Sequence, residues 1–477
     1  MDAEVVGSGP NGLAAAVVLA RAGLKVKVYE SASSAGGSAR SVSGALGDRV
    51  ITDVGSAVHP MAVASPFFKA FQLDSRIDLI TPDVSYAHPM DDGLAGVAFR
   101  SLDRTVARLG ADGTEWRRTF EPLIRKIEEL SSATSGTLFD VATRPGIAWA
   151  LGTRLAGQLS RNGQSAGTTS AMFAGLAAHS IARLPSIGGA SVGLVLGAHA
   201  HAAGWPIPRG GSQSITNAMI RDLVSHGGSV EIDHRIDTAD ELTAPIKLFD
   251  LSPRALAQVG GGLLPDWYRR KLRKFQYGGA ASKVDFLLSG PVPWGDPELA
   301  NAGTVHVGGT WAEIADGERR LQRGELVDRP YVMVSQPSSF DESRAPAGHH
   351  VLWTYTHVPN GSSRDMTEAI TRQIERFAPG FRDLVIGSIA TPATLIAARN
   401  ANHVGGDIAT GAVSLGQLLG RPSISLAPWR TPVRGAYICS ASSSPGPGVH
   451  GMAGFRAAQL ALRDMHGITE TPNLGLS

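Results

Sequence analysis

The chain has 477 residues, 43% of them hydrophobic and 18% charged, and such a length predicts two or three domains. Lysine and arginine total 44 and aspartate and glutamate total 42, so the charge balance excludes the strongly basic surface of a nucleic-acid-binding protein. Cys439 is the only cysteine, which excludes a disulfide framework or a redox-active cysteine pair within the chain, and we expect it to be buried.

The first residues predict a strand, a glycine-rich turn, a helix and a second strand. The first strand closes at residues 5–6, the helix is expected over residues 14–22 and the second strand over residues 26–29. The turn has the spacing of a dinucleotide-binding loop and consists of Gly7, Ser8, Gly9, Pro10, Asn11 and Gly12. Its glycines permit a tight turn, close approach of the backbone to a pyrophosphate, and packing of helix on strand. No secretion signal precedes this unit, so we expect a cytoplasmic protein.

An acidic residue follows the second strand. Glu30 lies 18 residues beyond Gly12, where a carboxylate accepts hydrogen bonds from the adenosine ribose. Its neighbour Ser31 is a second candidate for binding the cofactor there. Because a carboxylate at this point would repel a 2′-phosphate, the sequence favours FAD or NAD over NADP.

Two further features favour FAD over NAD. The sequence SSAGGSAR adds a second glycine pair, Gly36-Gly37, and a cation, Arg40, to the phosphate-binding region. Residues 53–60, DVGSAVHP, predict a turn that passes beneath a flavin and contains His59. We therefore expect FAD as the cofactor.

Two stretches of the middle of the chain differ in pattern. Residues 76–204 predict mainly helices, including a buried helix and turn in the uncharged stretch 184–208, whose glycines and prolines disfavour a membrane span. Residues 276–404 predict strands in SKVDFLLSG, RPYVMVSQPSSF and HHVLWTYTHVP, and a helix in RDMTEAITRQIERFAP.

The segment WYRRKLRKF, residues 267–275, packs five cations beside aromatic residues. On a helix, Leu264, Tyr268, Leu272 and Phe275 share one face, so we expect a helix whose charged face meets water. The alternative is docking of this segment to a membrane surface that supplies a lipophilic substrate.

The C-terminal segment GAYICSASSSPGPGVHGMAGFRAAQLAL predicts a strand, a turn rich in glycine and proline, and an apolar helix. This is a second anion-binding helix N-terminus, more than 400 residues after the first. The chain therefore binds either two ligands or one long ligand held from both ends.

These motifs resemble the phytoene-desaturase-like flavoproteins, a branch of the fold shared by amine oxidases and GDP-dissociation inhibitors. Within this branch, the sequence is most similar to the pyridine nucleotide-disulfide oxidoreductase domain 2 group. The resemblance implies that one FAD is held from both ends, with Ile236 at the adenine. It also implies that the C-terminal loop reaches the isoalloxazine ring, and the residues placed there are Ser440, Gly448, Val449, His450 and Met452. A helix N-terminus beside the ring would stabilise negative charge by about 0.3–1 kcal/mol.

The resemblance also implies an α/β fold, in which a Rossmann-like FAD-binding domain is interleaved with a substrate domain of mixed sheet and helices. We expect the FAD-binding domain to comprise residues 1–75, 205–275 and 405–477. The substrate domain is expected to comprise residues 76–204 and 276–404.

Three residues are candidates for catalysis. Lys283 matches the lysine that amine-oxidase relatives place beside flavin N5 through a water, while a solvated or carboxylate-paired lysine is the alternative. His450 and His59 lie next to the expected ring site, where packing or loop hydrogen bonding is the alternative. No His, Asp or Glu cluster has the spacing of metal ligands, so we expect no metal site.

The resemblance implies an FAD-dependent oxidoreductase that takes hydride from a C–C bond of a hydrophobic small molecule, with oxygen or a quinone as electron acceptor. A polyene isomerase or saturase, an amine oxidase and a non-catalytic protein like the dissociation inhibitors are the alternatives. Gly451 stands where amine oxidases place an aromatic residue, which disfavours that class.

Overall fold

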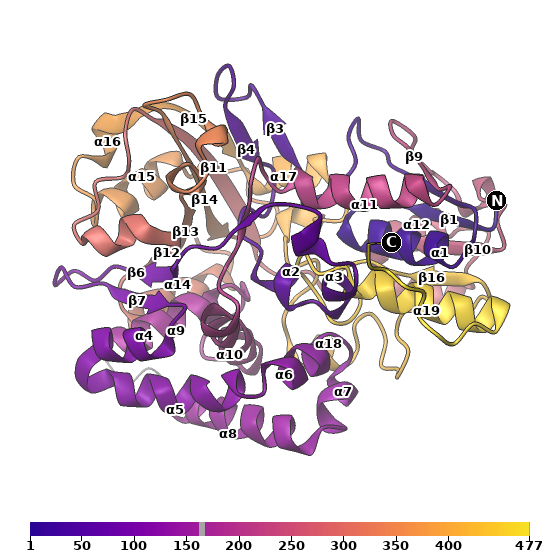
Figure 1. Cartoon of the computed structure of the whole chain (residues 1–477), viewed down its shortest axis with the longest axis horizontal. Coiled ribbons are helices and arrows are strands. Elements are labelled where there is room, and N and C mark those ends of the chain that lie inside the picture. The colour runs from indigo at the N-terminus through magenta and orange to yellow at the C-terminus, as the bar shows by residue number, and fades with distance from the viewer. Residues whose placement is uncertain (162–166, 477) are drawn as a thin grey trace.

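The computed structural model describes residues 1–161 and 167–476. A five-stranded parallel sheet collects segments from distant parts of the chain, in the order β16-β10-β1-β2-β9. Its strands are β1 (Ala3–Val6), β2 (Val26–Tyr29), β9 (Ser229–Glu231), β10 (Ile246–Phe249) and β16 (Ala436–Ile438). Figure 1 shows this sheet on the side of the molecule where both chain ends lie. This is the Rossmann-like sheet that the sequence predicts.

The first helix begins earlier than expected. Helix α1 runs from Pro10 to Arg21, because Gly9 adopts the extended N-cap conformation and Pro10 occupies the first helical position. The expected start at residue 14 was therefore wrong, and Gly12 lies in the first turn of the helix rather than in the loop.

The C-terminal helix packs directly on this first helix. Helix α19 (Met452–His466) lies against α1, and α11 (Gln213–Ser225) packs on another side of it. A Cβ on Gly454 would overlap the carbonyl oxygen of Asn11 and lie 3.0 Å from the Ala15 nitrogen. Cys439 follows β16 and is fully buried in the same core, as predicted.

A second sheet of seven strands has the order β15-β11-β14-β13-β12-β6-β7. Three of its strands were expected from the sequence: β11 (Ala280–Leu288), β13 (Val332–Ser335) and β14 (His350–Val358). Four were not: β6 (Val84–His88), β7 (Gly96–Phe99), β12 (Ala302–Val307) and β15 (Val385–Thr391). The pairing is antiparallel except between β12 and β6, so the sheet is mixed.

Helices cover both sheets. The mainly helical stretch consists of α4 (Leu102–Leu109), α5 (Gly113–Ile124), α6 (Ile127–Thr134), α7 (Leu138–Ala142), α8 (Pro145–Arg161), α9 (Thr168–Ala178) and α10 (Ile187–Ala202). These helices lie on the lower side of the molecule in Figure 1. The other helices are α2 (Pro60–Ala64), α3 (Pro66–Ala70), α12 (Pro253–Val259), α13 (Asp266–Arg273), α14 (Trp311–Leu321), α15 (Thr367–Glu375), α16 (Phe381–Leu384), α17 (Ala393–Arg399) and α18 (Leu415–Leu419).

The structure also describes two segments whose helices were predicted from the sequence, the uncharged stretch 184–208 and residues 267–275. Within the described residues, no helix is both long and apolar enough to span a bilayer, and the uncharged stretch 184–208 forms α10 and the short strand β8 (Ile207–Pro208). In α13, Tyr268 and Leu272 are buried as predicted, whereas Trp267 is 54% exposed. Docking of this helix to a membrane stays a prediction.

Candidate functional site

The glycine-rich turn is shaped by an aspartate that the sequence analysis did not identify. Asp250 follows β10, and its Oδ2 accepts a hydrogen bond of 3.1 Å from the Gly12 N–H. A Cβ on Gly9 would lie 2.5 Å from the same oxygen, and a Cβ on Gly7, whose φ is +99°, would lie 2.9 Å from the Asp250 carbonyl. The turn therefore has room for backbone only, which is what close approach of a phosphate requires. An acidic residue at the carboxyl end of a strand of a parallel sheet was the sequence signal for Asp250.

Burial raises the pKa of the Asp250 carboxyl to about 7, and the nearby Glu30 adds to the rise. The folded state therefore retains a proton that an unfolded aspartate loses above its usual pKa near 4. The stabilisation that the protonated Asp250 contributes to the folded state is fully present below about pH 4 and is lost as the pH rises toward 7.

We expect Asp250→Asn to remove this pH dependence. The free energy of unfolding of the wild type minus that of the variant should fall by about 1.4 kcal/mol per pH unit from pH 5 to roughly 6.5, and should level off above pH 7. Urea unfolding of both proteins at several pH values measures the difference. A difference that stays constant over this range would contradict the assignment.

Glu30 is held in a defined orientation at the end of β2. Its Oε2 accepts hydrogen bonds from the Ser8 N–H at 3.1 Å and the Ser8 hydroxyl at 2.6 Å, and its Oε1 accepts one of 2.9 Å from the Ala32 N–H. Ser8 in turn accepts a hydrogen bond from the Gly36 N–H at 3.1 Å. The two glycine-rich segments are thus joined through one serine.

A groove of about 290 Å³ runs from this turn to the C-terminal loop. The predicted cofactor residues that line it are Gly7, Gly9, Pro10, Asn11, Glu30, Ser31, Gly37, Arg40, Ile236, Ser440, Gly448 and Val449. The predicted residues that do not line it are Gly12, Gly36, His450 and Met452. Gly12 and Gly36 instead shape the walls through the hydrogen bonds above, and Met452 is buried in the core beside α1. The structure therefore brings both ends of the chain to one groove.

The groove also contains residues that the sequence did not single out. Asn402 donates a hydrogen bond of 2.7 Å to the Asp250 carbonyl, and the ring of His403 lies 2.5 Å from the Ser38 hydroxyl. Both belong to the loop that follows α17, at the end of the stretch 276–404 that the sequence analysis placed in the substrate domain.

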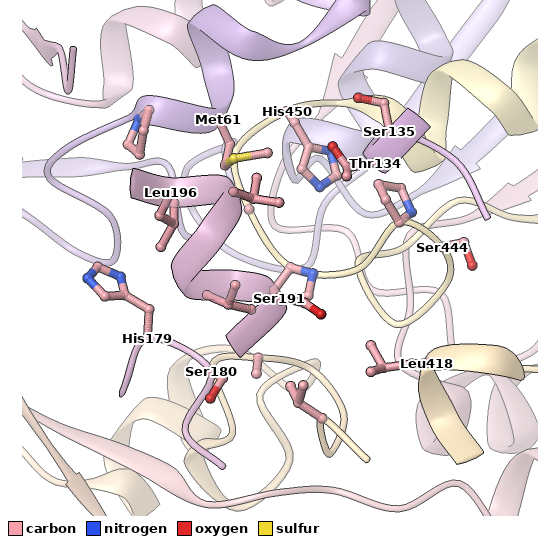
Figure 2. Close-up of a pocket in the computed structure, with 18 of the residues that line it drawn as sticks. Met61, Thr134, Ser135, His179, Ser180, Ser191, Leu196, Leu418, Ser444 and His450 are labelled. Atoms are coloured by element: carbon pink, nitrogen blue, oxygen red, sulfur yellow. The ribbon is translucent and has the colours of Figure 1, made fainter. Parts of the chain in front are cut away.

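A second pocket of about 400 Å³ opens beside the C-terminal loop (Figure 2). It shares five lining residues with the groove: Ser56, Ile408, Pro447, Gly448 and Val449. Side chains of α6, α7 and α10 form much of its wall, and most of them are apolar or carry only a hydroxyl. Figure 2 shows Ser191 and Leu196 on one helix that borders the pocket. The two cavities therefore meet at residues 447–449.

Three histidines line this pocket. Burial lowers the pKa of His59 and of His450 to about 4, and that of His179 to about 3. All three imidazoles are therefore neutral at pH 7. His59 Nε2 lies 2.7 Å from the Ser212 hydroxyl, and its buried Nδ1 has no hydrogen-bond partner among the described residues. His179 Nε2 lies 3.0 Å from His306 Nε2.

His450 has a structural position at the start of α19. Its Nδ1 accepts a hydrogen bond of 3.0 Å from the Met452 N–H, so its proton is on Nε2, which lies 3.1 Å from the Gly446 carbonyl. Both ring nitrogens are used to cap the helix and hold the loop. A catalytic role for His450 stays a prediction, and it would require these bonds to break.

Lys283 lies on β11 and lines neither cavity. Its ammonium group is ion-paired with the buried Asp285, and it is 5.9 Å from the ring of Trp353. This is the carboxylate-paired alternative of the sequence analysis, so catalysis by Lys283 stays a prediction. Across residues 1–161 and 167–476, no group of three or more His, Cys, Asp or Glu side chains is arranged to hold a metal ion.

Comparison with known sequences supports the N-terminal assignment. The family model of the NAD(P)-binding Rossmann-like domain matches residues 5–71. The pyridine nucleotide-disulfide oxidoreductase domain-containing protein 2 of Rattus norvegicus is 26% identical over 301 residues, which are 55% of this chain. The matched region spans 52% of that protein, about half its length.

Solved structures share the fold of the whole chain. An oxidoreductase from Methanosarcina mazei has a TM-score of 0.62 at 15% identity, covering 96% of this chain and 100% of that one. A triple mutant of putrescine oxidase with redesigned cofactor binding has a TM-score of 0.61 at 16% identity, covering 98% of both chains. The chain is thus similar over about half its length to pyridine nucleotide-disulfide oxidoreductase domain-containing protein 2, matches the NAD(P)-binding Rossmann-like domain model at its N-terminus, and shares its overall fold with putrescine oxidase.

Proposed function

We propose that this protein is an FAD-dependent oxidoreductase that oxidises a C–C bond of a hydrophobic small molecule. The observation that carries this proposal is the meeting of the two cavities. A groove that begins at the nucleotide loop joins a mostly apolar pocket at residues 447–449. A cofactor that filled the groove would have its far end beside a substrate in the pocket.

The residues of the groove fit FAD. The glycine turn accommodates phosphates, Glu30 is oriented for a ribose, and Ile236 and Val259 add apolar wall to the same cavity. When bound, FAD would supply a two-electron acceptor for hydride at N5, and oxygen or a quinone would reoxidise it. Desaturation removes a hydride from one carbon and a proton from its neighbour, and the proton needs a base; among the described lining residues, the neutral imidazoles of His59, whose Nδ1 has no partner, and of His179 are candidates.

The pocket supports a hydrophobic substrate rather than an amine. Leu138 lines the pocket while it is 42% exposed, so an apolar residue stands at the entrance. The described lining residues include no phenylalanine, tyrosine or tryptophan and no carboxylate that would attract an ammonium group, and they include the cation of Arg421. An amine oxidase therefore ranks below oxidation of a C–C bond.

Two measurements test the proposal. The purified protein should carry FAD, identified by mass after denaturation, and lipophilic candidate substrates should bleach its flavin absorbance under anaerobic conditions. Formation of product without lasting bleaching would instead favour the redox-neutral polyene isomerase or saturase. Peroxide release with simple amines would favour the amine oxidase, and a colourless protein that cannot be loaded with FAD would favour a non-catalytic protein.

We expect Glu30→Gln to weaken FAD binding by about 10- to 100-fold, because a hydrogen bond to a charged partner contributes about 1.5–3 kcal/mol. Titration of the FAD-free protein with FAD, followed by flavin fluorescence, gives the dissociation constant. Glu325→Gln is the matched control, since Glu325 forms exposed ion pairs with Arg320 and Arg323 away from the groove. Equal affinity of the wild type and Glu30→Gln would show that Glu30 does not bind the cofactor.

A further inference from the structure

The apolar pocket contains one ionised group among its described lining residues. No aspartate, glutamate or lysine lines it, and its histidines His59, His179 and His450 are neutral at pH 7 because burial lowers the pKa of each. Arg421 is the exception. Burial lowers the pKa of its guanidinium to about 10, which still leaves it protonated at pH 7.

Arg421 has hydrogen-bond donors without partners. Its side chain is 3% exposed, and Nη2 donates to the Ala409 carbonyl at 2.5 Å and to the Thr410 hydroxyl at 3.4 Å. Its Nε is buried with no partner, and within the described part of the chain Nη1 forms no hydrogen bond either. Nη1 is therefore available to donate a hydrogen bond to a ligand.

One oxygen of the carboxylate that attracts Arg421 is used elsewhere, and the other, Asp407 Oδ1, is buried without a hydrogen-bond partner among the described residues. Asp407 stabilises the charge of Arg421 electrostatically, but among the described residues the Arg421 side chain is hydrogen-bonded to Ala409 and Thr410 and not ion-paired with Asp407. Its Oδ2 accepts hydrogen bonds from the Gly278 N–H at 2.8 Å and the Gly411 N–H at 2.9 Å, which hold the surrounding loop. Tyr277 is the other titratable group that acts on Arg421, and burial raises the pKa of its hydroxyl, so it is neutral at pH 7.

A buried cation without an ion-pair partner is unfavourable, and an anion that enters the pocket would relieve this cost. We propose, building on the function above, that the substrate carries a carboxylate at one end of an apolar body and that Arg421 binds this carboxylate. A carboxylate supplies one charge and two coplanar oxygens, which match a single guanidinium. A phosphate monoester would bring nearly two charges and leave part of its charge unpaired.

The position of Arg421 also orients the substrate. It bonds to Ala409, the neighbour of Ile408, which lines both cavities. The carboxylate would therefore lie at the cofactor end of the pocket. The apolar body would extend along Val192, Val195 and Leu196 of α10 toward Leu138 at the entrance. The carbon atoms closest to the carboxylate would be those nearest the groove.

Binding of matched ligands tests this inference. Isothermal titration calorimetry on the protein as purified would compare hexanoate, octanoate and decanoate, each with the uncharged primary amide of the same chain length. We expect the wild type to bind the carboxylate at least about 10-fold more tightly than the amide for one or more lengths. Arg421→Gln should abolish the preference and leave amide binding unchanged, while Arg421→Lys should keep part of it.

Arg434→Gln is the control, because Arg434 is exposed and does not line the pocket. If Arg421→Gln does not fold, the affinities of the wild type for the carboxylate and for the amide still test the inference. Equal binding of the two ligand types, binding of neither, or a preference that persists in a folded Arg421→Gln variant would overturn the inference. The flavin content of the same preparation is a separate result: a protein without FAD contradicts the proposed function, whereas an FAD-containing protein without carboxylate preference contradicts only the role of Arg421.

Discussion

Replacing Gly454 with alanine should destabilise the protein by about 3 kcal/mol or more. The added Cβ would overlap the carbonyl oxygen of Asn11 and lie 2.7 Å from the carbonyl carbon of that residue. These are backbone atoms of α1, so no side-chain rotation can make room, and α19 must move away from α1. Because the loop before α19 lines the groove, we also expect weaker FAD binding.

Gly152→Ala is the matched control. Gly152 lies within α8, and a Cβ there would meet no atom within 4 Å. The same substitution should therefore stabilise the protein by about 0.5–1 kcal/mol, through helix propensity alone. Denaturant unfolding followed by circular dichroism measures both variants. If Gly454→Ala were as stable as the wild type, α19 would not be packed on α1 as the structure has it.

Replacing Arg344 with methionine should cost about 3–5 kcal/mol, the usual effect of breaking a buried ion pair. Arg344 is fully buried and forms ion pairs with Asp53 at 2.7 Å and Asp341 at 2.9 Å, and it donates a hydrogen bond of 3.1 Å to the Pro208 carbonyl. Methionine would fill much of the volume but would leave Asp53 without the cation of Arg344 and Asp341 with the more distant Arg209, 3.9 Å away.

The ion-pair network of Arg344 extends to the pocket, so Arg344→Met should also disturb the hydrogen bonding of His59. Asp53 accepts a hydrogen bond of 2.8 Å from the Ser212 N–H, and the Ser212 hydroxyl contacts His59. Arg382→Met is the control, since Arg382 is 52% exposed in its ion pair with Glu368 and should lose less than about 1 kcal/mol. Similar losses in the two variants, measured by denaturant unfolding, would mean that the buried network contributes no more than a surface ion pair.

The nucleotide loop could be predicted from the sequence because its requirements are local. Three features that define it lie within 30 residues of one another: a glycine at a positive φ, a proline at the first helical position and an acid after the next strand. Strand β11 was equally visible, because alternating apolar residues mark it. In contrast, β12 and β15 were missed: β12 begins with alanine and glycine, which are poor strand formers, and β15 is largely half-exposed.

The residues of the site that escaped prediction depend on distant partners. Arg344 and Asp53 are 291 positions apart, and Asp250 is 238 positions from Gly12. His179 and His306 are separated by 127 positions and sit in segments with no motif. Asp250 had one local signal, its place at the end of a strand, but nothing in the local sequence marks Arg344 or His179, because burial and tertiary pairing give them their importance. Lys283 shows the converse, since its sequence position matched a motif whereas its side chain is paired with Asp285.

The packing of α19 on α1 also bears on how the protein is made. A ribosome releases the first strand, turn and helix more than 400 residues before it releases β16 and α19. Until then the apolar flank of the first helix stays uncovered and one wall of the nucleotide groove does not exist. A cofactor of the proposed kind would therefore bind late in biogenesis, and a translation product truncated before Ala436 would leave this apolar flank exposed and be prone to aggregation.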